Sequence, residues 1–81
     1  MNHQENIARY PMLEGILALR NLPLQPMYTT RAAAQVFGIT GRGLQNWMRS
    51  GRLVPRDLPG RARFLSKDLE EFLMASRKQA S

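Results

Sequence analysis

The sequence of 81 residues contains no cysteine, and no apolar run in it approaches the length of a membrane span. The absence of cysteine excludes disulfides, thiolate zinc sites and a cysteine nucleophile. The N-terminal segment MNHQENIARY lacks the basic-then-apolar order of a signal peptide. A chain of this length buries one modest core. We therefore expect one small cytoplasmic domain without membrane association.

Residues that support catalysis are also scarce. The single histidine, His3, lies in the polar segment 1–10, which we expect to be loosely structured. No pair of carboxylates marks a pocket, and GITGRG at 38–43 lacks the glycine order and the flanking strand of a nucleotide-binding fingerprint. We therefore predict that the protein is not an enzyme and that it binds no metal and no small-molecule cofactor.

Acidic residues are scarce in the middle of the chain, and this placement produces the net charge of +6. Basic and acidic residues balance in 1–27 and in 67–81, whereas 28–66 holds seven arginines against Asp57 alone, and seven minus one is the whole +6. The planar guanidinium of arginine binds phosphate and the guanine edge in a bidentate manner. This segregation predicts that residues 28–66 bind a polyanion; a solvated basic surface without a ligand is the alternative. The seven arginines are Arg31, Arg42, Arg49, Arg52, Arg56, Arg61 and Arg63.

Proline marks both ends of a first helix. Pro11 suits the first helical position, and Pro23 and Pro26 end the helix in a stiff connector. The pattern predicts a helix over residues 11–22 with a broad apolar arc. Two interpretations of this arc are open, because it suits either the seam of a homodimer or cooperative oligomer, or packing on its own domain. The arc contains Met12, Leu13, Ile16, Leu17 and Leu19.

Threonine and glycine delimit two further helices. Thr29 or Thr30 caps a helix that Gly38 stops in the left-handed conformation, and Thr40 caps the next helix, which runs to about Ser50. Two short helices joined by a tight glycine turn form a helix-turn-helix.

The second of these helices, residues 41–50, separates into two faces at 3.6 residues per turn. Leu44, Trp47 and Met48 share the inward face. The opposite face carries arginine, asparagine and glutamine, whose donors and acceptors read guanine and adenine edges in the major groove. A merely solvated helix more often carries glutamate and lysine, and neither occurs between residues 38 and 53. The residues predicted to read bases are Arg42, Gln45, Asn46 and Arg49.

Two glycines, Gly41 and Gly43, stand at the start of this helix, although glycine weakens a helix. On the helical wheel they lie between the two faces, where the missing side chains let the helix approach a phosphate backbone closely. In the other interpretation, TGRG is a longer turn and the helix begins near Leu44.

The segment 52–65 predicts a hairpin of two short strands over about residues 56–63. Alternation places two arginines on one face and Ala62 and Phe64 on the other. A basic hairpin beside a recognition helix is a wing, which contacts phosphates or the adjacent minor groove. A charged loop without a ligand is the alternative. The arginines that crowd the tip are Arg56, Arg61 and Arg63, of which the last two share a face.

A last helix follows the hairpin. Ser66 is predicted to cap it, and its first turns hold acidic residues, as the helix dipole favours. Its inward stripe is expected to close the core, and residues 77–81 are expected to form a flexible tail. The acidic residues are Asp68, Glu70 and Glu71. The stripe is Leu69, Phe72, Leu73 and Ser76, packed against Phe37, Trp47 and Phe64.

Three stretches together resemble the excisionase/MerR-type winged helix-turn-helix DNA-binding domain: YTTRAAAQVFGIT, LQNWMRSGRLVP and PGRARFLSKDLEEFL. They carry the paired alanines, the glycine turn, the Ser-Gly-Arg-Leu helix end and the Gly-Arg-x-Arg hairpin of that family. The resemblance covers about residues 28–73 and implies DNA binding by a recognition helix and a wing, without catalysis. Ala32 stands where the family often has glutamate, and the small residues that often precede the recognition helix are here Gly41 and Gly43.

The predicted fold is mainly α with a small β-hairpin, a MerR/excisionase-like winged helix-turn-helix with an extra N-terminal helix. Residues 1–27 form an N-terminal extension, residues 28–76 the winged domain and residues 77–81 the tail. The expected partner is double-stranded DNA, and a homodimer or cooperative oligomer through residues 11–22 is one of the two open interpretations of that segment. The expected DNA contacts are Arg31, Arg42, Gln45, Asn46, Arg49, Arg52, Arg61 and Arg63.

Two functions fit these features. In the first, the protein binds a specific duplex sequence as a small transcriptional regulator or an excisionase-like recombination directionality factor. Because one such module buries only about 600 to 1,000 Å² of protein surface, this function favours two or more copies. In the second, the protein is a DNA-recognition or adaptor module of a larger assembly, such as a phage DNA-packaging complex. Self-association favours the first function, and a persistent monomer with exposed apolar surface favours the second.

Overall fold

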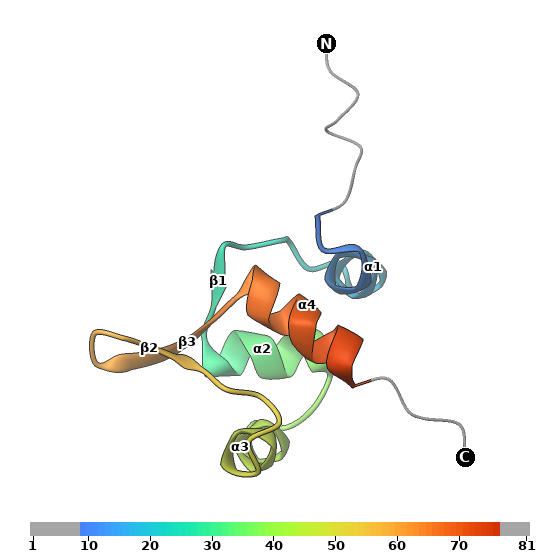
Figure 1. Cartoon of the computed structure of the whole chain (residues 1–81). Coiled ribbons are helices and arrows are strands. Elements are labelled where there is room, and N and C mark those ends of the chain that lie inside the picture. Colours follow the sequence, from blue (N-terminus) through green and yellow to red (C-terminus); the bar gives the residue numbers. More distant parts are fainter. Residues whose placement is uncertain (1–8, 77–81) are drawn as a thin grey trace.

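The computed structural model describes residues 9–76, so the predictions made for residues 1–8 and 77–81 lie outside the described part of the chain. The elements in this part are α1 (Pro11–Arg20), β1 (Met27–Tyr28), α2 (Thr30–Phe37), α3 (Gly41–Arg49), β2 (Arg56–Leu58), β3 (Arg61–Leu65) and α4 (Ser66–Ala75). Figure 1 shows α1 and α3 on opposite sides of the domain, with α2 and α4 between them. None of the helices in residues 9–76 has both the length and the apolar character needed to cross a membrane.

Side-chain caps define the helix-turn-helix formed by α2 and α3. Thr29 Oγ1 and Thr40 Oγ1 each accept a hydrogen bond from the backbone amide three residues later, at 2.9 and 3.0 Å. Between the helices, Gly38 has a φ of +67°, a left-handed conformation that favours glycine. Because Thr40 caps the second helix, α3 begins at Gly41. The interpretation of this region as a longer turn is therefore wrong.

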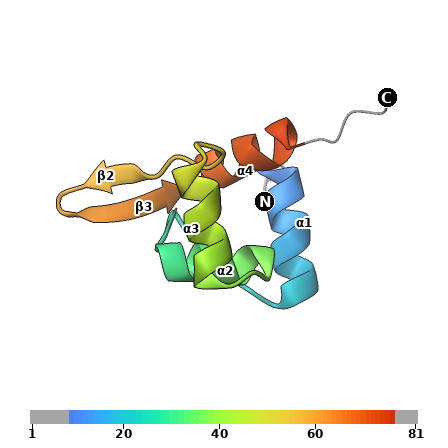
Figure 2. The same ribbon diagram turned by 90° about the horizontal axis from the view of Figure 1, so that it is seen from below.

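The three strands form an antiparallel sheet in the order β1-β3-β2. β2 and β3 make the predicted hairpin, which projects from the helices at one end of the domain (Figure 2). The short strand β1 was not predicted, because two residues are too few to show the alternation of a strand. It carries Tyr28, which is 1% exposed and whose hydroxyl accepts from Gln25 N at 3.0 Å and donates to Pro23 O at 3.4 Å. The connector between α1 and α2 is thereby fixed to the end of β3.

The core lies among the helices and β3, and an aromatic cluster closes one edge of it. The rings of Phe37, Trp47 and Phe72 lie with their centroids 5.1 to 5.4 Å apart and link α2, α3 and α4. The predicted inward stripe of α4 is confirmed at Leu69, which is fully buried, but it is wrong at Ser76, which follows the end of α4 and is exposed. The buried apolar residues are Leu13, Leu17, Tyr28, Ala33, Ala34, Val36, Leu44, Leu53, Phe64 and Leu69.

α1 packs on its own domain. Leu13 and Leu17 are 0% and 2% exposed, and the helix contacts α4 and α2. The buried carboxylate of Glu70 accepts hydrogen bonds from Leu13 N at 2.8 Å and Met12 N at 3.2 Å. These amides have no acceptor within α1, so a residue of α4 caps α1. Glu70 was predicted to act on the dipole of its own helix, and that prediction is wrong because the carboxylate faces the neighbouring helix. The outer side of α1 alone remains for a second copy.

The start of α4 also differs from the prediction. Leu65 occupies the N-cap position, and Asp68 Oδ2 accepts a hydrogen bond from Leu65 N at 2.9 Å. The hydroxyl of Ser66 donates instead to the carbonyl oxygen of Gln25. The prediction that Ser66 caps α4 is wrong, because β3 runs directly into α4 and the serine finds an acceptor in the connector.

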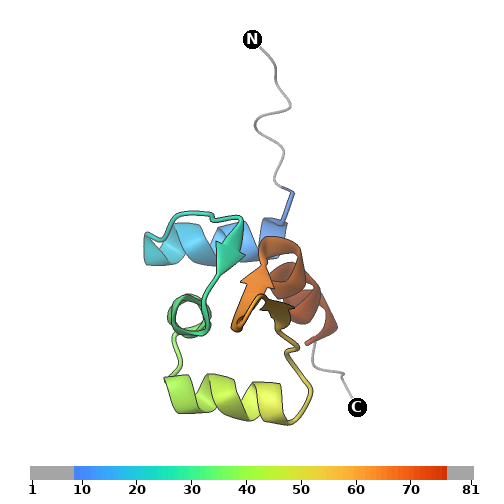
Figure 3. The ribbon, with the colours of Figure 1, turned by 90° about the vertical axis from the view of Figure 1, so that its left-hand side faces the viewer.

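The order of the elements defines the fold. A helix-turn-helix formed by α2 and α3 is followed by the β2–β3 hairpin and the closing helix α4 (Figure 3). The protein is therefore a winged helix-turn-helix with α1 added at the front, as the sequence predicted.

Candidate nucleic-acid interface

α3 lies at the surface with its polar face outward. Figure 2 shows α3 in front of the other helices, beside the base of the hairpin. Leu44 is 1% exposed, and Trp47 and Met48 are partly buried, so the inward face fastens α3 to α2 and α4. The separation into two faces follows the sequence prediction, because the four polar residues Arg42, Gln45, Asn46 and Arg49 are all exposed.

The arginines of this surface keep their donors. An arginine carries five N–H donors, and a carboxylate partner in the same protein would occupy two of them. In residues 9–76, the structure contains ion pairs only for Arg56 and Lys67, both with residues of α4. Within the same residues, the guanidinium groups that make neither a hydrogen bond nor an ion pair are those of Arg9, Arg31, Arg42, Arg49, Arg52 and Arg61.

Arg56 differs from the other arginines of the hairpin. Its Nε and Nη2 donate to the two carboxylate oxygens of Asp68 at 2.8 and 2.9 Å. This bidentate hydrogen bonding is the main reason why the pKa of Asp68 is lowered and the pKa of Arg56 is raised. Arg56 was expected to lie with Arg61 and Arg63 at the hairpin tip, but its guanidinium is held by Asp68 of α4. The pair instead fastens β2 to the first turn of α4.

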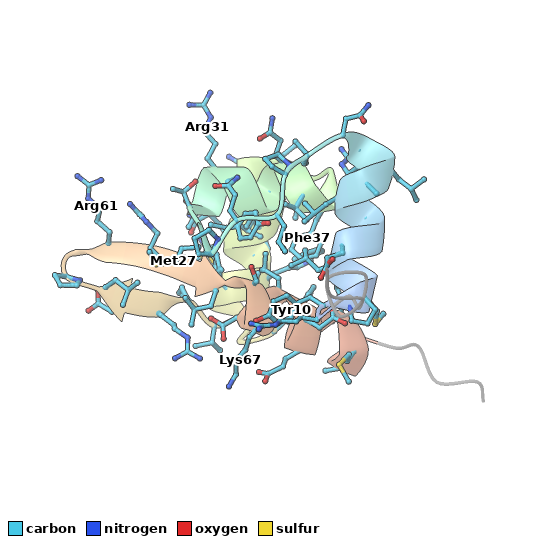
Figure 4. All side chains as sticks on the ribbon, turned by 90° about the horizontal axis from the view of Figure 1, so that it is seen from above. Tyr10, Met27, Arg31, Phe37, Arg61 and Lys67 are labelled. Carbon is cyan, nitrogen blue, oxygen red and sulfur yellow. The ribbon has the colours of Figure 1, made fainter. Side chains whose placement is uncertain are left out.

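The two other arginines of the hairpin are presented differently. Arg61 is exposed and projects from the hairpin beside the turn (Figure 4). Arg63 is partly buried, and its Nη1 donates to Ala62 O at 2.9 Å. The alternation along β3 holds at Phe64, which is fully buried. The hairpin therefore presents one unpaired arginine at its tip and one partly held arginine near its base.

Two further arginines flank α3. A shallow groove between α2 and the first turns of α3 is lined by Arg31, Gln35, Gly41 and Gln45, together with threonine and apolar side chains. Arg31 projects away from the domain (Figure 4) and is exposed. Arg52 is exposed and follows α3 at its other end. The polar face of α3 thus lies between basic residues contributed by the preceding helix and by the following loop.

The fold does not require glycine at the first position of α3. A Cβ added to Gly41 would meet no atom within 4 Å, and this glycine has no positive φ. A Cβ added to Gly43 would lie 3.4 Å from Thr40 Oγ1, which is an ordinary contact. Glycine inside a helix is less favourable than alanine by about 1 kcal/mol. No contact within residues 9–76 accounts for Gly41.

The fold and its surface together define a winged helix-turn-helix with a basic, outward-facing second helix. A family model described as a helix-turn-helix domain matches residues 27–77, which is more than half of the chain. The protein belongs to this helix-turn-helix domain family, a family of excisionase-like DNA-binding domains. No curated protein and no solved structure matches the chain. The predicted resemblance is confirmed, family membership indicates DNA as the partner, and α1 lies before the matched region.

Proposed function

We propose that the protein binds a specific sequence of double-stranded DNA by inserting α3 into the major groove and laying the β2–β3 hairpin along the adjacent backbone or minor groove. In this role it acts as a small transcriptional regulator or an excisionase-like recombination directionality factor. The observation that carries the proposal is the exposed polar face of α3, whose arginines have no partner within residues 9–76.

The chemistry of that face suits base recognition. Arg42 and Arg49 have the fork geometry that binds O6 and N7 of guanine, and Gln45 and Asn46 have the paired donor and acceptor that bind N6 and N7 of adenine. The absent side chain of Gly41 lets the first turn of α3 approach the phosphate backbone, where the free amides and the helix dipole favour an anion. We assign base reading to this face.

The remaining arginines have the role of positioning the domain on the duplex. Arg61 and Arg63 on the hairpin contact phosphates or the adjacent minor groove, while Arg31 and Arg52 contact phosphates on either side of α3. Phosphate contacts fix the orientation of a protein on DNA without reading its sequence. Loss of these residues therefore weakens binding to all duplexes to a similar degree.

A randomised duplex pool tests the proposal. The purified chain is titrated into the pool across a salt series, binding is followed by fluorescence anisotropy, and the retained duplexes are sequenced. We expect a short shared sequence and an affinity that falls steeply as the salt concentration rises, since phosphate contacts release counterions. Retention of duplexes without any shared sequence contradicts specific recognition, and no binding at low salt contradicts DNA binding altogether.

One observation favours the second candidate function, an adaptor or DNA-recognition module of a larger assembly such as a phage DNA-packaging complex. The side of α1 that faces away from the core exposes apolar residues, among them Leu19, which is 88% exposed. Exposed apolar surface of this kind suits a protein partner. A homodimer or cooperative oligomer through residues 11–22 uses the same surface within the first function, and the choice of partner separates the two functions.

A further inference from the structure

The outer side of α1 is apolar, although it lies in contact with water. Six residues of α1 are exposed; one is Arg20, and the five that share this side carry no charge and no polar side-chain atom. A surface helix usually carries charged or polar residues on the side that faces water, so this side differs from the usual pattern. We call it the outer face of α1; it consists of Pro11, Met12, Gly15, Ala18 and Leu19.

The two charged side chains of α1 lie on other sides of the helix, and both are bonded to the backbone of the domain. Glu14 Oε2 accepts a hydrogen bond from Tyr10 N at 3.0 Å. Arg20 Nε donates to Gln35 O at 3.2 Å, and its guanidinium lies against Gly38 at the C-terminal end of α2. The outer face is therefore uncharged, in a protein whose net charge is +6.

The apolar surface continues onto α4. Met12 lies beside this helix because its amide donates to Glu70, and Met74 follows Glu70 by one helical turn on the same side of α4. Met12 and Met74 are 45% and 61% exposed. Apolar surface on α4 thus adjoins the outer face, and α1 itself lies on the side of the domain away from α3 (Figures 1 and 3).

When positions are paired at equal distances before and after Gly15, the large Met12 corresponds to the small Ala18 and the large Leu19 to the smaller Pro11. Pro11 and Met12 lie one turn before it, and Ala18 and Leu19 lie one turn after it. Gly15 lies inside a helix, where glycine is unfavourable, and an added Cβ would meet no atom within 4 Å of its own chain. A face that lacks a side chain at its centre, and in which each large side chain corresponds to a smaller one, suits close crossing by an identical helix that runs in the opposite direction.

We propose that a second copy of this chain covers the outer face, with the two α1 helices antiparallel and crossing at Gly15. Met12 of each copy then lies against Ala18 of the other, and Leu19 lies against Pro11. This is the surface through which two strongly basic copies meet without bringing their arginines together. Because α3 lies on the opposite side of the domain from α1, the two recognition helices of the dimer face away from each other. On the basis of the proposed DNA-binding function, one dimer bridges two separate duplex segments.

The area buried between the two α1 helices, here called the seam, sets the strength of the dimer. A helix of ten residues is about 15 Å long, and a seam of this length buries less than the ~1,200 Å² at the lower end of stable interfaces. The dimer is therefore weak and concentration-dependent in free solution. Two duplex segments held close together raise the local concentration of the bound domains and favour bridging.

Sedimentation of the full chain without DNA tests the seam. We expect the mean mass to rise from monomer toward dimer with concentration, and Leu19→Lys to keep the chain monomeric because it places charge at the seam. Val54→Lys is the matched control: Val54 is an apolar residue 69% exposed in the loop before β2, away from α1. It should associate as the wild type does. A wild type that stays monomeric up to hundreds of micromolar overturns the proposal, as does a Leu19→Lys variant that still dimerises.

Cross-linking tests the antiparallel arrangement. Since the chain has no cysteine, every disulfide reports on an introduced residue. An oxidised mixture of Met12→Cys and Ala18→Cys chains should form the mixed pair at least fivefold more than either self-pair. Preferred self-pairing at both positions indicates parallel helices and overturns the arrangement.

Bridging is measured as capture of a labelled free duplex by an immobilised duplex. The wild type is expected to capture the free duplex. Leu19→Lys is expected to capture at least tenfold less of it, while its affinity for a single duplex stays within about twofold of that of the wild type. Capture by Leu19→Lys equal to that of the wild type overturns the bridging role. Failure of the proposed DNA-binding function gives a different result from failure of bridging. In that case neither the wild type nor Leu19→Lys would bind even a single duplex, while the wild type would still self-associate. A wild type that binds single duplexes as a monomer and never bridges leaves the DNA function intact and removes this proposal.

Discussion

The charged side chains of α1 and α4 differ from those of α3 in whether they are bonded within the fold. On α1 and α4, charged side chains form hydrogen bonds with the backbone: Glu14 and Glu70 accept from backbone amides, and Arg20 donates to a backbone carbonyl. On α3, Arg42 and Arg49 make no hydrogen bond or ion pair with any residue in 9–76. Similar helices therefore carry charge for different purposes. The number of charges does not distinguish them, whereas the bonding of each charge within the fold does.

The same contrast runs through the hairpin. Arg56 and Arg61 lie on neighbouring strands, yet Arg56 makes a bidentate pair with Asp68 and Arg61 projects unpaired beside the turn. The sequence assigned both to the same basic tip. Substitution of a residue that is bonded inside the fold should lower the stability of the protein. Substitution of a residue that makes no such bond should affect DNA binding alone.

The largest effect should come from Glu70→Ala. The substitution leaves the amides of Met12 and Leu13 without their charged acceptor, and we expect a loss of about 1.5 to 3 kcal/mol in the free energy of unfolding, measured by urea denaturation. Glu71→Ala is the matched control on the adjacent, exposed position, whose contact with Lys67 Nζ at 4.0 Å is a weak surface pair. Equal losses in the two variants would contradict the assignment of Glu70 as the cap of α1.

Next in size are the binding effects of α3 and the hairpin. Alanine at Arg42, Asn46 or Arg49 should reduce the preference for the selected site over other duplexes by about 1 to 3 kcal/mol. Alanine at Arg61 or Arg63 should weaken binding to all duplexes alike and flatten its salt dependence. Competition anisotropy with selected and scrambled duplexes measures both effects. If the two groups of variants lose affinity identically on every duplex, the proposed division between base reading and positioning is wrong.

Asp68→Asn should reduce stability by about 1 kcal/mol, since it weakens the acceptor of Leu65 N at the start of α4. The effect should depend on pH. Because hydrogen bonding to Arg56 lowers the pKa of Asp68 below its ordinary value of 3.8, the stability that this carboxylate adds is complete well above that value and is lost as the pH falls through the lowered pKa.

Unfolding measured at pH 7 and at a series of values descending below 3.8 should therefore separate the wild type from Asp68→Asn at neutral pH, and the difference should narrow as the pH passes through the lowered pKa. The exposed Asp57→Asn, on β2, serves as the control for a change of charge alone. A constant difference between wild type and Asp68→Asn at every pH would show that the carboxylate charge is not what stabilises the contact.

The smallest expected effect on stability is that of Gly41→Ala, and it separates folding from binding most sharply. An added Cβ meets nothing within 4 Å, so stability should stay unchanged or rise by up to about 1 kcal/mol. Affinity for a single duplex should fall, because the methyl group stands where the backbone of DNA approaches. Gly15→Ala, in α1, should give a similar gain in stability without loss of single-duplex binding. Unchanged affinity in Gly41→Ala would exclude close approach at this position.

The local part of the fold was predictable because short-range signals specify it. Thr29, Gly38 and Thr40 set the bounds of α2 and the start of α3 through contacts within a few residues. The polar and apolar faces of α3 follow from helical periodicity alone. The turn before Arg61 carries Gly60 at a φ of +76°, so the hairpin follows from glycine chemistry.

The amino-acid sequence by itself determined the helix-turn-helix, the hairpin and the outward row of base-reading candidates, because caps, glycines and periodicity act between near neighbours. Only the tertiary structure decided which charges are left for a ligand. Glu70 meets α1 across 57 and 58 residues of chain, and Arg56 meets Asp68 across 12. The partners of such contacts depend on how helices and strands pack against one another, which local patterns do not specify. For the same reason, the tertiary structure revealed that the apolar arc of α1 has one side in the core and a second side facing solvent.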